Sequence, residues 1–199
     1  MKTLFIILLL CTGTAFAQNV AAEKKAAQDA ALAFLKWYKT GWKGFDQYKL
    51  YSSAKPKSDG PPYTINWKNV DKHFAWIKAN ALLFAAAFIK NEKKYFEYSN
   101  QMFKKYPTEE MPSGFDYERV LGSQEEVGIT LKSYWLNKAM VWKVKMLNKA
   151  KAEIAVLEKG ASDDGSSYRF LMIKENGSWK VALPPGMFGV PPFEKETNM

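Results

Sequence analysis

Residues 168–183 read Tyr-Arg-Phe-Leu-Met-Ile-Lys-Glu-Asn-Gly-Ser-Trp-Lys-Val-Ala-Leu, and this stretch decides the fold. Two apolar runs flank Asn176-Gly177, the dipeptide that most strongly indicates a two-residue hairpin turn. Upstream, residues 140–146 and 152–156 alternate apolar with polar side chains, as half-buried strands do. The last third of the chain therefore predicts three or four antiparallel strands.

Helical periodicity dominates the chain before these strands. Apolar residues recur at helical spacing over 18–43 and 81–106, and a short helix is expected to begin near Asn69 or Asp71. Because helices and strands are segregated along the chain, the sequence predicts an α+β fold rather than an alternating α/β fold. We expect the N-terminal helices to pack on a curved C-terminal antiparallel sheet, followed by an extended Pro/Gly-rich tail at 185–199.

The first 17 residues have the pattern of a cleaved export signal. Lys2 precedes an unbroken apolar run, and Ala15 and Ala17 form a small-x-small cleavage motif. We expect cleavage after Ala17 rather than lipidation at Cys11, which follows a large residue. The apolar run is shorter than the roughly 18 residues that span a bilayer, so no transmembrane segment is predicted. The mature protein is expected in the periplasm or outside the cell.

Composition and charge exclude several classes of protein. The chain has 199 residues, of which 47% are hydrophobic, too many for a fibrous or wholly disordered protein. Its formal net charge of +9 comes almost entirely from scattered lysines, and Arg119 and Arg169 are the only arginines. Because arginine is the residue that reads phosphates and base edges in a bidentate manner, we expect no nucleic-acid partner.

The titratable residues form no recognisable catalytic set. His73 is the only histidine, and we expect it at the surface or at a helix cap. The expected mature chain has one imidazole and no thiol, too few for a zinc site, and no phosphate-cradling or dinucleotide-binding glycine motif is present. The paired acids at 109–110 and 125–126 are typical of solvated loops. The sequence therefore predicts no metal, no cofactor and no catalytic residue, and leaves enzymatic activity open.

The hairpin ending Asn-Gly-Ser-Trp-Lys-Val at 176–181 resembles the nuclear transport factor 2-like superfamily. Two further stretches, Phe-Leu-Lys-Trp-Tyr at 34–38 and Phe-Asp-Tyr-Glu-Arg-Val-Leu-Gly-Ser-Gln-Glu at 115–125, resemble an exported bacterial family, domain of unknown function 3828. The resemblance spans residues 26–184 and implies one domain, over 18–184, shaped as a cone-like α+β barrel around the N-terminal helix. It implies a pocket between helix and sheet, and it implies no activity.

Aromatic residues are concentrated in the first helix and in the strands. If the sheet curls into a cone, Tyr38, Trp142 and Trp179 face inward and line a cavity suited to a ring-shaped or acyl ligand. Gln124 and Arg169 are the polar residues expected near its mouth, where Arg169 would hold a carboxylate. The alternative is that the large side chains fill this cavity and form a solid core.

These observations favour an exported, non-enzymatic domain that binds a small apolar, aromatic or acyl ligand or an envelope protein. One alternative is a pocket enzyme of the isomerase or hydrolase type, which needs a carboxylate base and a tyrosine donor. The expected inward strand positions offer no acid. Another alternative is an inhibitor or interaction protein acting through its sheet face, which a homodimer would favour. The irregular segment 108–126 is long enough to indicate a functional region.

Overall fold

The computed structural model describes residues 2–80, 82–112, 114–115, 117–161, 168–189 and 191–193, with side chains from residue 19 onward. The side chains of the expected signal peptide at 1–17 lie outside this part of the chain, as do residues 194–199 of the expected tail. Within the described residues, no helix is long and apolar enough to cross a membrane.

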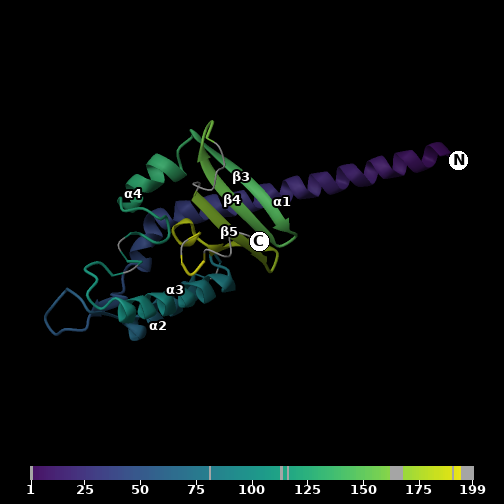
Figure 1. The fold of residues 1–199 in the computed structure, drawn as a ribbon. Coiled ribbons are helices and arrows are strands. Elements are labelled where there is room, and N and C mark those ends of the chain that lie inside the picture. The colour runs from purple at the N-terminus through teal and green to yellow at the C-terminus, as the bar shows by residue number, and fades with distance from the viewer. Residues whose placement is uncertain are drawn as a thin grey trace.

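The α-helices precede the four-stranded sheet along the chain (Figure 1). They are α1 (Lys2–Phe45), α2 (Trp67–Ala79), α3 (Ala86–Lys105) and the short α4 (Val127–Thr130), which continues as a π-helical turn at Leu131–Trp135. The cap of α2 is Asn66, whose side chain accepts from the Asn69 N–H at 3.3 Å, so this helix begins earlier than predicted. Helix α3 begins at Ala86, later than predicted, and Leu82 before it is 89% exposed.

The last third of the chain forms the predicted antiparallel sheet. Its strands, in spatial order, are β3 (Met140–Asn148), β4 (Lys151–Glu158), β5 (Tyr168–Glu175) and β6 (Ser178–Leu183). Asn176 and Gly177 turn between β5 and β6 with φ of 52° and 79°, the positive values that a type I′ hairpin turn requires. The α+β class is therefore confirmed.

The four strands form an open sheet and not a closed barrel. At its β6 edge, Val181 exchanges backbone hydrogen bonds with Leu83 and Ala85, at 3.1 and 2.9 Å, so the segment before α3 covers that edge. A separate two-stranded antiparallel hairpin is formed by β1 (Tyr51–Ser53) and β2 (Tyr63–Ile65).

Aromatic rings fill the space between α1 and the sheet. Helix α1 lies across one face of the sheet (Figure 1). Phe170 of β5 meets Phe34 of α1 at a centroid distance of 6.2 Å and Trp135 at 5.4 Å, both edge to face. Trp142 stacks on the same Phe170 ring at 6.4 Å. The interface where the resemblance implied a pocket is thus packed with side chains.

The segment after β6 packs back onto the domain. Pro185–Met187 forms a short 3-10 helix (η2), and Met187 and Phe193 are buried. Gly186 approaches the 115–128 loop closely, because its N–H donates to the Val120 carbonyl at 3.1 Å. A Cβ at position 186 would lie 2.2 Å from the Arg119 carbonyl oxygen, so only glycine fits there. The described residues beyond 184 therefore belong to the packed structure.

This close approach predicts that Gly186→Ala lowers the free energy of unfolding by about 1–3 kcal/mol, the usual effect of overpacking. The clash is with backbone, which cannot rotate away. Gly128→Ala is the matched control, because a Cβ there meets nothing within 4 Å. Urea denaturation measures both. Equal stability of Gly186→Ala and the unmodified chain would show that the segment is not seated as described.

Candidate functional site

A cleft of about 1200 Å³ opens between the C-terminal end of α1, the segment that follows it, and the 115–128 loop. Its volume is sufficient for a small organic molecule. Seven aromatic side chains line it: Tyr38, Trp42, Phe45, Tyr48, Tyr51, Phe115 and Tyr117. Because ring faces offer large apolar contact area and phenol groups offer polar contacts, this wall suits a ligand with both an apolar body and a polar group.

A buried ion pair holds the loop that forms one wall of the cleft. The Arg119 guanidinium donates from Nη2 to Glu92 Oε2 at 3.0 Å and from Nε to Oε1 at 3.3 Å. Glu92, on α3, is fully buried, and the Arg119 side chain is 10% exposed. The guanidinium also lies over the rings of Phe45, Tyr95 and Phe96, at 4.9–5.9 Å from their centroids. A bidentate pair in such surroundings fixes both position and orientation.

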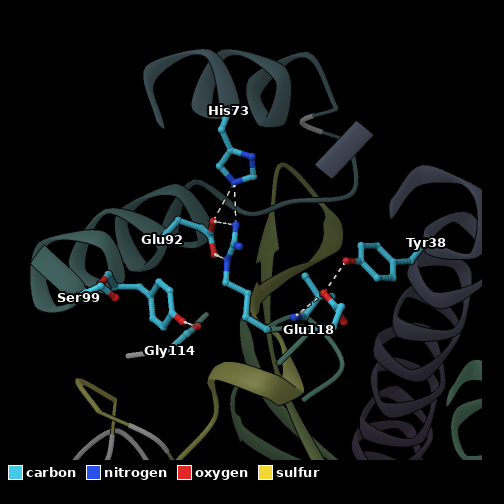
Figure 2. A network of polar contacts seen from close by, with 9 residues as sticks. Tyr38, His73, Glu92, Ser99, Gly114 and Glu118 are labelled. Carbon is cyan, nitrogen blue, oxygen red and sulfur yellow. Dashed lines mark hydrogen bonds and ion pairs between the residues drawn. The ribbon is translucent and has the colours of Figure 1, made fainter. Parts of the chain in front are cut away.

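His73 completes this buried cluster, and the expectation of a surface or capping histidine is wrong. Its side chain is 0% exposed, and Nε2 lies 2.9 Å from Glu92 Oε2 (Figure 2). Nε2 is also 3.2 Å from Arg119 Nη2, while Nδ1 is buried without a described partner. These contacts fit a neutral imidazole that donates from Nε2 to the carboxylate, since Nδ1 then carries no proton that needs an acceptor.

The charge state of the cluster follows from its geometry. Burial alone raises the pKa of Glu92, but the Arg119 charge and the His73 hydrogen bond outweigh it and lower this pKa to about 2. Burial also lowers the pKa of His73, against the opposing effect of Glu92. At neutral pH the cluster therefore holds one carboxylate, one guanidinium and one neutral imidazole.

Glu118 ties the same loop to α1. Its carboxylate accepts from the Tyr38 hydroxyl at 2.7 Å and from the backbone N–H groups of Val120 and Leu121 at 2.9 and 2.7 Å (Figure 2). The Glu118 carbonyl accepts from the Gly122 N–H at 2.8 Å, and Gly122 has φ of +71°, which closes the turn. The loop is thus bound to α3 by the ion pair of Arg119 and to α1 by the hydrogen bond of Glu118.

Burial raises the pKa of Glu118, and its three hydrogen bonds oppose that effect. Burial likewise raises the pKa of the Tyr38 phenol well above its usual value, and the Glu118 carboxylate adds to the shift. The Tyr38 proton is therefore held between two oxygens at the cleft wall. This arrangement stabilises the wall, and it commits the Tyr38 hydroxyl to Glu118.

The five residues expected to form a site are divided between two places. Tyr38 and Gln124 line the cleft, whereas Trp142, Arg169 and Trp179 lie on the sheet and are not among its lining residues. Arg169 of β5 pairs with Glu153 of β4, and the Trp179 indole N–H donates to Glu23 of α1 at 3.0 Å. The structure therefore brings together only two of the five.

The three residues of the buried cluster, His73, Glu92 and Arg119, were not predicted as site residues from the sequence. The sequence around each of them nevertheless contains an indication of a buried polar contact. Glu92 interrupts the apolar face of α3 at helical spacing from Phe88, Tyr95 and Phe96. His73 stands three residues after Val70 and four before Ile77, both buried. Arg119 is one of two arginines in a lysine-rich chain. A charged residue on an interior helix face needs a buried partner, and that requirement pairs them.

No protein family, no curated protein and no solved structure matches this chain. The resemblance to the nuclear transport factor 2-like superfamily therefore stays a prediction.

The buried pair predicts that Glu92→Gln lowers the free energy of unfolding by about 3–5 kcal/mol, because it leaves the Arg119 charge buried without its counter-ion. Glu97→Gln is the control on the same helix. Glu97 is exposed and lies 3.8 Å from Lys93, so its loss should change stability by about 0.5 kcal/mol or less. Urea denaturation of both variants at neutral pH provides the comparison. Similar effects of the two substitutions would contradict the structural role assigned to Glu92.

The buried histidine predicts a pH dependence of stability. The pKa of His73 is lower in the folded chain than its usual 6.5, so as the pH falls the unfolded chain takes up a proton at a higher pH than the folded chain. The free energy of unfolding therefore falls as the pH drops below 6.5. In His73→Gln this part of the fall should disappear. The measurement is urea denaturation of both chains between about pH 8 and pH 5. Parallel curves would refute a buried neutral imidazole.

Proposed function

We propose that this protein is a non-enzymatic binding protein whose small apolar or aromatic ligand occupies the cleft between the end of α1 and the 115–128 loop. The observation that carries the proposal is the cleft itself, about 1200 Å³ with seven aromatic side chains in its wall. Such rings at a cleft surface leave apolar area for a ligand to bury.

The rigid wall supports this role. The 115–128 loop contains no long helix and no strand among its described residues, yet Arg119 and Glu118 attach it to two helices. The Tyr95 hydroxyl donates to the carbonyl of Gly114, the residue just before the loop (Figure 2). A preorganised wall reduces the entropy that binding would otherwise lose in ordering the loop.

A pocket enzyme is less well supported. The alternative requires a free carboxylate base and a tyrosine that donates to the substrate. The cleft does hold a half-buried carboxylate beside a tyrosine, but the Tyr38 hydroxyl donates to Glu118 itself at 2.7 Å. Two backbone N–H groups donate to the same carboxylate, so both of its oxygens already accept hydrogen bonds within the protein. The pair is therefore suited to holding the wall.

An interaction protein acting through its sheet is also less well supported. Strand β3 is an edge of the sheet, and Lys143 and Lys145 are exposed along it. These lysines lie on the face of β3 opposite Trp142 and Val144, and charged residues are depleted in the cores of protein interfaces. Export, the envelope location and a cone-like curl of the sheet around α1 remain parts of the proposal that rest on the sequence pattern.

The proposal predicts that the full chain retains a small molecule in native mass spectrometry after incubation with a metabolite extract. Ser52→Trp should abolish retention, because Ser52 lines the cleft and an indole there would occupy it. Ser58→Trp should retain the molecule, because Ser58 is exposed and is not a lining residue. Both variants are compared by circular dichroism to confirm folding.

Two results would overturn the proposal. One is an unmodified chain that retains no molecule from the extract. The other is equal retention by Ser52→Trp and the unmodified chain, which would place the ligand away from the cleft. A changed mass of the molecule in the released fraction would show turnover, and the protein would then be a pocket enzyme and not a binding protein.

A further inference from the structure

We propose that the ligand of this cleft is an organic cation, an ammonium group carried on an apolar or aromatic body. This inference rests on the proposed function and names the chemical class that the same cleft selects. Three features of the cleft support it: its charge relative to the rest of the chain, the end of α1 that forms part of it, and the aromatic rings beside its carboxylates.

The cleft is acidic although the chain as a whole is basic. Its lining includes five acidic residues and three basic ones: Asp46, Asp59, Glu118, Glu125 and Glu126 against Lys39, Lys49 and Arg119. The chain carries a formal net charge of +9, so this local balance is opposite to the average surface. Arg119 is paired with Glu92 at 3.0 Å and Lys49 with Asp59 at 3.8 Å, which leaves four of the lining acids against Lys39. A concave surface of one charge sign raises the local concentration of the opposite ion.

The C-terminal end of α1 adds to the negative potential. The helix ends at Phe45, and both Trp42 and Phe45 line the cleft. Carbonyl groups in the last turn of a helix carry a partial negative charge that favours nearby cations. Asp46 follows at once, and its N–H donates to the Trp42 carbonyl at 2.8 Å, which keeps its carboxylate next to that last turn.

Two carboxylates approach the cleft beside aromatic rings. Glu118 binds the Tyr38 hydroxyl at 2.7 Å, and Asp46 is close enough to Tyr38 and Tyr51 to help raise the pKa of both phenols, although burial is the largest cause for each. Trp42 and Tyr51 are half-buried, with part of each side chain accessible. An ammonium group is attracted to the face of such rings as well as to carboxylates, whereas an anion is repelled by both. The same walls would accept the apolar body of the ligand.

The test uses three probes that share a phenyl ring and differ in charge: 2-phenylethylammonium, 2-phenylethanol and phenylacetate. Isothermal titration calorimetry of the full chain at neutral pH and low ionic strength measures the affinity for each. We expect the ammonium probe to bind at least threefold more tightly than the alcohol, and the carboxylate probe to bind most weakly. The advantage of the ammonium probe should shrink as salt is added, because part of the cleft is open to screening.

A single substitution separates charge from shape. Asp46→Asn should weaken binding of 2-phenylethylammonium about two- to fivefold and leave binding of 2-phenylethanol unchanged. Asp71→Asn is the matched control, because Asp71 is exposed on α2 and is not a lining residue. Both positions are exposed, so neither change should prevent folding.

The outcomes distinguish this inference from the proposed function. Two results would overturn the inference that the ligand is a cation. One is equal or tighter binding of the alcohol or of phenylacetate, and the other is an Asp46→Asn chain with unchanged affinity for the ammonium probe. In that case retention of a neutral or anionic molecule, lost in Ser52→Trp, would leave the binding function standing. No binding of any probe, together with no retained molecule in native mass spectrometry, overturns both.

Discussion

The arrangement of the cleft depends on one buried ion pair, Arg119 with Glu92. Removing two charges from water is costly, and the pair is tolerated only because the geometry is bidentate and His73 satisfies one carboxylate oxygen further. If the loop shifted along α3, the Arg119 guanidinium would be buried without the Glu92 carboxylate as its counter-ion. The pair therefore fixes where an otherwise irregular loop meets α3. Hydrophobic contacts alone would leave that register less defined, since they are not directional.

The Arg119–Glu92 pair also positions the residues next to Arg119 in the chain, which form the wall of the cleft. Glu118 is the neighbour of Arg119, so fixing the arginine also delivers the Glu118 carboxylate to Tyr38 on α1. The loop then closes on itself through Gly122, and Gly186 fits against its backbone from the far side. Four segments that are distant in sequence thus meet at residues 118–122. Between α1 and the sheet, by contrast, aromatic rings pack against one another.

The sequence predicts the fold better than the site, for physical reasons. Alternation along the strands and the Asn176-Gly177 turn are local signals, and the four strands appear where they were expected. Trp142 and Trp179 were correctly placed on strands, but a strand pattern does not tell whether the facing space is open or filled. That depends on Phe34, Trp135 and Phe170, which come from three elements. The buried cluster is a non-local property as well, because no pattern near His73 shows that Glu92 and Arg119 will meet it.

The central claim is that the ligand binds at the end of α1 and not between α1 and the sheet. The seven tryptophans report on both places, with Trp42 in the cleft and Trp135 and Trp179 buried at the helix–sheet interface. The most direct test is a titration of the ¹⁵N-labelled chain with 2-phenylethylammonium, followed through the indole N–H resonances by nuclear magnetic resonance. The account predicts a saturable shift of the Trp42 resonance while those of Trp135 and Trp179 stay in place. Saturable shifts at Trp135 and Trp179 with an unmoved Trp42 would contradict it.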